Sequence, residues 1–461
     1  AGGVASGAVF NSLGSSAAMN DAGQVVYAAV LRSGLGGVDV SNDSGIWRDS
    51  DLIAREGSQA GGVTAGAVFN NFQTHVINNS GHVVFEANLR QGEGGVDASN
   101  NSGIWRGSTL IAREGSQAAD VPTGAVFDSF GYTVVNDAGQ VAFSGFLRRD
   151  LAGVDSTNDR GLWITGTNGE SLLVARSGDV IEGRTASSFG FARGSGGADG
   201  LGRSINNFSQ MAYEVNFTNG DGGIFLYTPD IHWTRTYTSS WDSSSAWTIG
   251  QRPGDPHDVF IDPDVSLTVN GPSGDVALNN LTIGGNNGIA TLRLNGGTIT
   301  PDNAITVTDT GIPTGDGTIA GDVNNNGTVL ADNVTVTGSL LNNNLITGNG
   351  RITADISNSG RIEAIGTAAA PADIQFDGGV SNNASTGLII SRNSTMRFND
   401  GLNNNGAFAV SFGTSDIFGD ITNKVTGSIV LSGGSNTTFY DDVNNFGSVV
   451  VAAAGTATST A

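Results

Sequence analysis

The first half of the chain repeats itself with a period of 58 to 59 residues. The segment GAVF begins at residues 7, 66 and 124, and SGIWR begins at residues 44 and 102. Each copy holds about four short runs of β-branched and aromatic residues separated by Gly, Asn and Asp, which is typical of strands joined by turns. No stretch keeps helical spacing over three turns. The repeats therefore predict an all-β domain.

A decayed fourth copy follows the first three, because residues 206–213 align with residues 136–143. Four units of four strands over residues 1–229 suit a small β-propeller-like domain, in which radial repetition leaves only short, protected strand edges. A stacked array of sheets is the alternative. Residues 230–257 are rich in Trp, Ser and Thr, and we expect a junction or cap there.

From residue 258 to 461 the pattern changes to Asn-Gly turns between β-branched strands. The turns recur every 16 to 24 residues, close to one coil of a right-handed parallel β-helix (solenoid). Stacked coils bury a common core and can align their asparagine amides in ladders. The expected ladder positions are Asn324, Asn342, Asn358, Asn382, Asn403, Asn423 and Asn444.

A short motif recurs once in each repeat. Asn20-x-x-Gly23-x-x-x-Tyr27 returns in phase from Asn78 and from Asn136. It resembles the tandem NxxGxxxF repeat of exported bacterial surface proteins, over residues 1–229. Residues 241–300 resemble the start of autotransporter-type β-helix passengers. The resemblance implies an extracellular or cell-surface protein, and because Ala1 lies inside a repeat unit we expect that a signal peptide has been cleaved.

Composition excludes several classes of function. With 21 Lys+Arg against 43 Asp+Glu, the net charge of −22 disfavours nucleic acid as a partner. The absence of cysteine excludes disulfides, thiolate metal sites and cysteine nucleophiles. No apolar run is long enough for a transmembrane segment.

Three loops, one per repeat, carry clustered carboxylates and amides of the kind that bind Ca²⁺. The alternative is an Asx turn, in which Asp and Asn bond their own backbone, and we favour it. No other cofactor is expected. The possible calcium ligands are Asp39, Asn42, Asp43, Asp97, Asn100, Asp155, Asn158 and Asp159.

Two further groups of residues are candidates for binding or catalysis. Trp241 and Trp247 could stack on sugar rings or cap the open end of the solenoid, and we favour the cap. Glu56 and Glu114 recur in phase, but a glycosidase needs two carboxylates in different environments, so ion pairing or a solvated strand edge is the better interpretation.

The sequence therefore favours a structural protein and not an enzyme. We expect a surface stalk, or a subunit that assembles with copies of itself into a fibre or coat through apolar strand-forming termini (Val9, Phe10, Val449, Val450 and Val451). A glycan-binding adhesin that recognises surface polysaccharide is the alternative, and a polysaccharide-degrading enzyme is the third.

Overall fold

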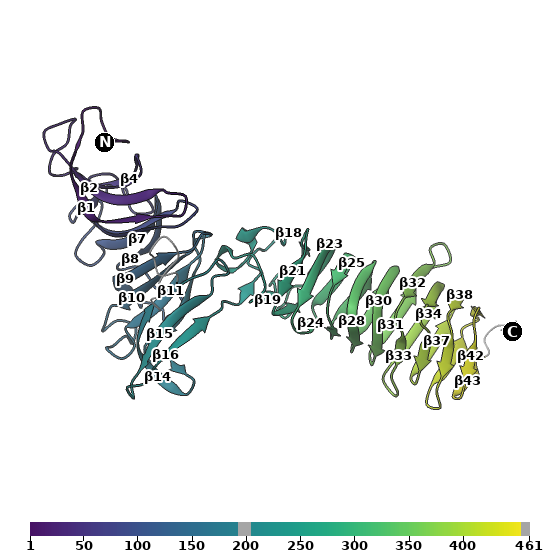
Figure 1. Cartoon of the computed structure of the whole chain (residues 1–461). Helices are drawn as coiled ribbons and strands as arrows, with labels where there is room; N and C mark the ends of the chain where they lie inside the picture. The colour runs from purple at the N-terminus through teal and green to yellow at the C-terminus, as the bar shows by residue number, and fades with distance from the viewer. Residues whose placement is uncertain (192–203, 453–461) are drawn as a thin grey trace. The chain divides into compact units, whose positions relative to one another are not determined.

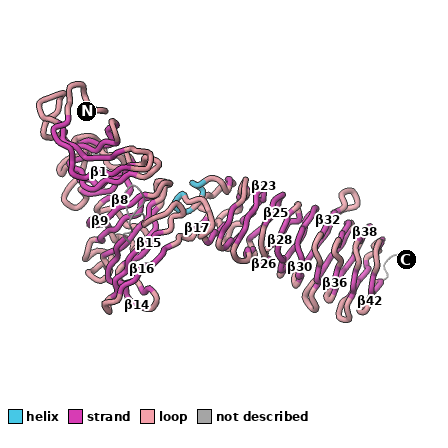
Figure 2. The backbone as a smooth tube through the Cα atoms, viewed as in Figure 1, coloured by secondary structure: helices cyan, strands magenta, loops and turns pink. Residues whose placement is uncertain are grey.

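The computed structural model describes residues 1–191 and 204–452, which form two compact units (Figure 1). The first unit comprises residues 1–229 together with Ile249–Gln251, and the second comprises Asp230–Thr248 and the chain from Arg252 onward. Strands dominate both units, and the described helices are two short 3-10 segments, η1 (Ser244–Ala246) and η2 (Thr248–Gly250), cyan in Figure 2. No helix in the described ranges is long and apolar enough to cross a membrane.

The first unit consists of four antiparallel four-stranded sheets, each with its strands in chain order. This up-and-down order is that of a propeller blade. The sheets contain β1 (Phe10–Met19), β2 (Val25–Leu31), β3 (Ser44–Arg48) and β4 (Asp51–Arg55); β5 (Phe69–Ile77), β6 (Val83–Leu89), β7 (Ser102–Arg106) and β8 (Thr109–Arg113); β9 (Phe127–Val135), β10 (Val141–Leu147), β11 (Arg160–Thr165) and β12 (Ser171–Arg176); β13 (Val180–Ile181), β14 (Arg184–Phe191), β15 (Met211–Phe217) and β16 (Gly222–Tyr227).

Consecutive sheets pack face to face. Val26 and Ile46 of the first sheet lie in one apolar cluster with Phe69, Phe85 and Trp105 of the second. Trp105 packs edge-on against Phe69 and parallel to Phe85, with ring centroids 5.1 and 6.2 Å apart. The repeated tryptophans are fully buried in the core, and each indole Nε1 donates to a loop carbonyl (Trp47 to Gly2, Trp105 to Gly61, Trp163 to Ala119).

The second unit is a parallel β-solenoid of about nine turns over residues 258–451, in agreement with the predicted fold class. It is preceded by β17 (Ile231–His232) and β18 (Ser239–Ser240), which pair with its first strands. Its strands are β19 (Asp258–Ile261), β20 (Leu267–Asn270), β21 (Val276–Leu278), β22 (Asn280–Ile283), β23 (Ala290–Pro301), β24 (Ile305–Val307), β25 (Gly311–Ile319), β26 (Val323–Asn325), β27 (Thr328–Ala331), β28 (Val334–Asn342), β29 (Leu345–Gly348), β30 (Gly350–Asn358), β31 (Arg361–Ile365), β32 (Ala372–Phe376), β33 (Val380–Asn382), β34 (Leu388–Arg392), β35 (Ser394–Phe398), β36 (Leu402–Asn404), β37 (Ala407–Ser411), β38 (Thr414–Phe418), β39 (Ile421–Asn423), β40 (Ser428–Ser432), β41 (Asn436–Phe439), β42 (Val443–Asn445) and β43 (Ser448–Val451).

Alternation of side chains explains why these strands stack. In β37 (Ala407–Ser411), Phe408 and Val410 point inward and are fully buried, while their neighbours are partly exposed. The strand lies in register with β34 before it and β40 after it, so Phe408 sits between Ile389 and Ile429. Each coil thus covers the apolar face of the previous one, because a single coil could not bury that face alone.

Candidate functional site

A row of asparagines runs through the solenoid, and all of them except the last, Asn445, are fully buried. Each side-chain Nδ2 before Asn445 donates to Oδ1 of the asparagine in the next coil at 2.7–2.8 Å. The second proton also has an acceptor, as in Asn342, whose Nδ2 lies 3.1 Å from the carbonyl oxygen of Arg361. The members are Asn325, Asn342, Asn358, Asn382, Asn404, Asn423 and Asn445. We call this row the asparagine ladder.

The ladder corrects three of the predicted positions by one residue. Asn324, Asn403 and Asn444 lie beside the ladder residues Asn325, Asn404 and Asn445, on the other face of the same strands. Asn403 is exposed, whereas Asn404 is fully buried. Since successive residues in a strand face opposite sides, the inward position in an Asn-Asn pair is the one that shares its face with the preceding apolar residue.

The asparagine of the NxxGxxxF motif links repeats in the first unit. Asn20 Nδ2 donates to the carbonyl oxygen of Asn78 at 2.9 Å, Asn78 Nδ2 to that of Asn136 at 2.6 Å, and Asn136 Nδ2 to that of Asn206 at 2.8 Å. The same side chain also closes its own turn, because Asn20 Oδ1 accepts from Gln24 N and Gly23 adopts a left-handed φ of 78°. The turn was predictable from the motif, but the contact with the next repeat was not.

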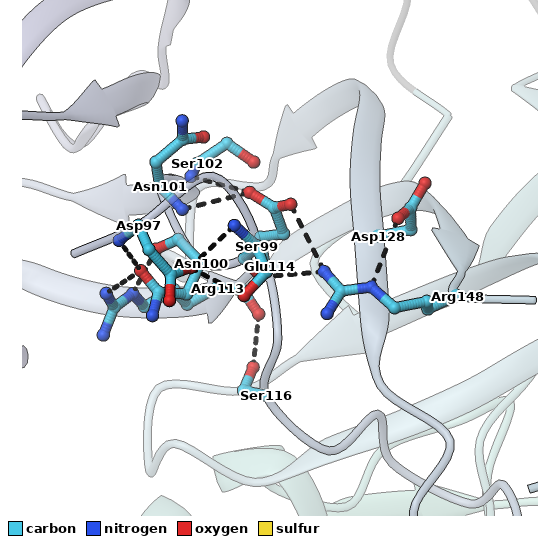
Figure 3. A network of polar contacts seen from close by, with 10 residues as sticks. All are labelled: Asp97, Ser99, Asn100, Asn101, Ser102, Arg113, Glu114, Ser116, Asp128 and Arg148. Atoms are coloured by element: carbon cyan, nitrogen blue, oxygen red, sulfur yellow. Dashed lines mark hydrogen bonds and ion pairs between the residues drawn. The ribbon is translucent and has the colours of Figure 1, made fainter. Parts of the chain in front are cut away.

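A second contact between repeats involves arginine and glutamate (Figure 3). The Arg148 guanidinium of the third repeat lies 3.3 Å from Glu114 Oε1 of the second and donates to the carbonyl oxygen of Ser99 at 2.8 Å. Glu114 Oε2 accepts from the backbone N–H groups of Asn101 and Ser102, and burial raises the pKa of this carboxyl. Arg90 and Glu56 repeat the contact one unit earlier at 3.4 Å.

These contacts give both glutamates a place in packing between repeats. Arg113, which directly precedes Glu114, donates instead to the carbonyl oxygen and side chain of Asn100. The sequence does contain a signal for the arginine that pairs with each glutamate. In each of the first three repeats an arginine directly follows the leucine that ends the second strand, at Arg32, Arg90 and Arg148.

The three candidate calcium loops have the geometry of Asx turns. Asp97 Oδ1 accepts from the backbone N and the hydroxyl of Ser99 at 2.8 and 2.7 Å, and these bonds lower the pKa of Asp97. Asn100 Oδ1 accepts from Asp97 N and from Arg113. The other two loops keep the Asx bonds, at Asp39 with Asn42 and at Asp155 with Asn158.

The remaining acidic members of the loops differ between repeats. Asp159 is buried and pairs with Arg149 at 2.6 Å, while Asp43 follows Asn42 at the equivalent place in the first repeat. Across residues 1–191 and 204–452, no group of three or more His, Asp or Glu side chains is placed to hold a metal ion. Calcium binding by these loops stays a prediction.

The two tryptophans proposed for glycan binding lie in the solenoid core. Trp241 and Trp247 are fully buried and pack edge to face with ring centroids 4.9 Å apart, and Trp233 packs against Trp247 at 5.0 Å. No face of either ring is open to a sugar, which corrects the assignment of a glycan site there. The three indoles lie in the same apolar cluster as the first solenoid strands, as the capping interpretation expects.

A hollow of about 460 Å³ opens among the first strands of the repeats in the first unit. It is lined chiefly by residues 74–78, at the end of β5, and by residues 132–137, at the end of β9. His75 Nε2 contacts the carbonyl oxygen of Ser16 at 3.1 Å, and burial lowers the pKa of this imidazole. His75 Nδ1 and Thr133 Oγ1 are buried without a hydrogen-bond partner in the described part of the chain. Such a hollow can accept a small ligand, and no motif marked its residues in advance.

The residues proposed for assembly differ in accessibility. Phe10 packs edge-on against Trp47 with ring centroids 5.0 Å apart, so it is part of the first sheet and not of a free strand that could be donated to a neighbouring molecule. Val9 is 41% exposed. Val449, Val450 and Val451 in β43 are each about half exposed on the last described coil.

Comparison with known proteins adds one finding. Residues 1–229 match the model of a family of unknown function, DUF7453. No curated protein and no solved structure matches the chain. The resemblance of the repeats to exported surface proteins therefore stays a prediction.

Proposed function

We propose that this chain is an extracellular structural protein, exported and used as a surface stalk or as a subunit of a fibre or coat. The observation that carries the proposal is the asparagine ladder, which joins seven successive coils through six amide–amide hydrogen bonds. The first unit uses its motif asparagines in the same way, each bonded to the next repeat.

The ladder favours a role in which shape matters. Each amide inside the ladder is buried, and both its protons and its oxygen are hydrogen-bonded. Moving one coil against the next would therefore leave buried polar groups without partners in an apolar core. Aligned amides also polarise one another, which strengthens the row beyond its separate bonds. A solenoid held in this way resists sliding and unwinding, as a stalk or fibre subunit requires.

Electron microscopy of the purified protein over a concentration series tests the proposal. We expect single copies at low concentration, and chains or sheets of copies that lengthen as the concentration rises. Single copies at every concentration would contradict the self-assembling role. Particles that catalyse turnover of a polysaccharide, with activity that co-purifies with the protein, would contradict the structural role itself.

The hollow in the first unit favours ligand binding as a second candidate function. Its unpartnered polar atoms, His75 Nδ1 and Thr133 Oγ1, are suited to the hydroxyl groups of a glycan. Replacing Thr133 by Val keeps the side-chain shape and removes the hydroxyl. If the protein is a glycan-binding adhesin, binding on a glycan array should fall in Thr133→Val while the melting temperature is retained.

A further inference from the structure

The sheets of the first unit have two unlike faces, and every interface between them joins one kind to the other. One face presents Val and Ile from the second and third strands, and the other presents Phe and Trp of the next sheet. Ile46, Ile104 and Leu162 hold equivalent positions, and each is 0% exposed because the following sheet covers it. A similar contact recurs between the third and fourth sheets, where Leu162 and Ile164 lie in one cluster with Phe191, Tyr213 and Phe217 and, among the described residues, no tryptophan takes part.

The fourth sheet leaves its aliphatic face open. Ile224 pairs with Glu214 across β15 and β16, as Ile104 pairs with Glu86 across β6 and β7, so the two isoleucines are equivalent. Ile224 is 73% exposed, and Leu226 on the same strand is 64% exposed. The carboxylate of Glu214, beside Ile224, is compatible with an interface. Its equivalent in the second sheet, Glu86, is only 8% exposed where the second and third sheets pack together.

In the described part of the chain, the turn of the fourth sheet also lacks the polar contacts that each earlier turn makes with the turn that follows it. Asp137 N donates to Asn207 Oδ1, and Asn136 Nδ2 donates to the carbonyl oxygen of Asn206, so each turn donates to the turn that follows it. Asn206 Nδ2 donates within its own turn to Gln210, and in the described part of the chain it has no following turn to reach.

The first sheet offers the other half of the same interface. Leu13 and Met19 on β1 are 65% and 50% exposed, whereas Ile77, the equivalent of Met19, is 1% exposed beneath the first sheet. Arg90 and Arg148 each reach back to the preceding repeat, but the side chain of Arg32 has no partner within the described ranges. β1 and β16 lie at opposite ends of the series of sheets in Figure 1.

We infer that the open face of the fourth sheet binds the first sheet of a second copy of this chain. The two open surfaces carry the halves of an interface that the chain already forms three times, which identifies a copy of itself as the partner. Charge agrees with this pairing, because the β15–β16 loop carries the exposed carboxylate of Asp221 where Arg32 of the second copy would lie. Such a contact joins unlike surfaces and does not close on itself, so it produces head-to-tail chains.

The inference rests on the proposed self-assembly and names its interface. Sedimentation of the full chain over a concentration series tests it with one variant and one matched control. Ile224→Lys places a charge in the open face, and Val425→Lys changes an apolar residue of similar exposure, 80%, on a solenoid turn. We expect the concentration for half-association to rise more than tenfold in Ile224→Lys and to stay unchanged in Val425→Lys. Arg32→Glu should weaken association from the other side.

The outcomes separate the interface from the function. Association that Ile224→Lys leaves unchanged overturns this interface while self-assembly stands. A single-copy mass for the unmodified chain at every concentration overturns both. Because the protein has no cysteine, a disulfide gives a direct check. A chain carrying Asp21→Cys and Asn207→Cys should form a ladder of covalent oligomers on oxidation, and either single variant should form at most dimers.

An internal pair controls the geometry of this cross-link. Asp137 and Asn207 already meet across the third and fourth sheets, so Asp137→Cys with Asn207→Cys should give an intramolecular disulfide and no oligomers. An internal bond that forms while the Asp21 and Asn207 pair yields no oligomers beyond dimers would overturn the head-to-tail contact.

Discussion

At the residue scale, asparagine side chains form hydrogen bonds that link one repeat to the next in the first unit and one coil to the next in the solenoid. The asparagine amide carries an acceptor and two protons on a short side chain, so one residue can close its own turn and still bond the neighbouring repeat. Asn78 shows both tasks, because its Nδ2 contacts His82 in the turn and the carbonyl oxygen of Asn136 in the next repeat. Substitutions at such positions affect two repeats at once.

We expect His82 to make the second repeat sensitive to pH. In the first and third repeats a glutamine oxygen accepts the amide proton, from Asn20 to Gln24 and from Asn136 to Gln140, but in the second repeat His82 Nδ1 lies 3.0 Å from Asn78 Nδ2. Asn78 Nδ2 can only donate, so His82 Nδ1 must be unprotonated to accept from it. Burial first, and then the charges of Arg106 and Arg48, lower the pKa of His82.

A folded-state pKa below the unfolded value means that protonation favours unfolding, so the stability is complete above about pH 6.5 and declines as the pH falls below it. We predict that His82→Gln, which restores the residue of the neighbouring repeats, flattens the pH dependence of the melting temperature between about pH 7 and 5. Calorimetry of both proteins at several pH values measures this. Parallel curves would show that His82 does not titrate on unfolding.

The asparagine ladder provides a test with a control in the same strand. Asn404→Ala removes a fully buried amide and leaves Asn382 and Asn423 with unmatched partners, so we predict a loss of about 1–3 kcal/mol in unfolding free energy. Asn403→Ala, one residue earlier and exposed, should cost less than about 0.5 kcal/mol. Denaturant unfolding of the two variants measures both, and equal losses would contradict the register of the ladder.

At the scale of elements, the turns between solenoid strands depend on glycine for space. A Cβ at Gly406 would lie 2.2 Å from the carbonyl oxygen of Gly387 in the previous coil, which is backbone and cannot turn away. We predict that Gly406→Ala lowers the unfolding free energy by about 1–3 kcal/mol through overpacking. Gly274→Ala is the control, because nothing lies within 4 Å of its Cβ, and it should leave the melting temperature within a degree or so.

Elements are also the scale at which the sequence predicts best. In-phase repeats and regular Asn-Gly turns are enough to predict strands, sheets and coils, since both patterns reflect spacing along one chain. Spacing alone does not say which of two adjacent asparagines faces inward. The alternation of side chains along the strand does, because Asn325 shares its face with Val323 and Asn324 does not. Spacing also does not say that Glu114 pairs with Arg148 of the next repeat, because that contact is set by how one sheet packs on another. The hollow around His75 could not be predicted from the sequence either, because it too is set by how the sheets pack.

At the scale of the whole molecule, charge opposes the association that the open sheet faces favour. Each copy carries a net charge of −22, so two copies repel at low ionic strength, whereas the proposed contact is mainly aliphatic and amide in character. Salt shortens the screening length from about 30 Å at 0.01 M to about 10 Å at 0.1 M and about 3 Å at 1 M, which suppresses the repulsion and leaves burial of Ile224 and Leu226 almost unaffected.

We therefore predict that association tightens as sodium chloride rises from about 0.01 to 1 M, measured as the weight-average mass by light scattering at fixed protein concentration. Ile224→Lys should remain unassociated over the same range, because the lysine would have to be buried in an apolar interface without a partner. Association that weakens with salt would instead indicate that opposite charges such as Arg32 and Asp221 dominate the contact. In that case Arg32→Glu should alter the salt dependence of the weight-average mass more strongly than Ile224→Lys does.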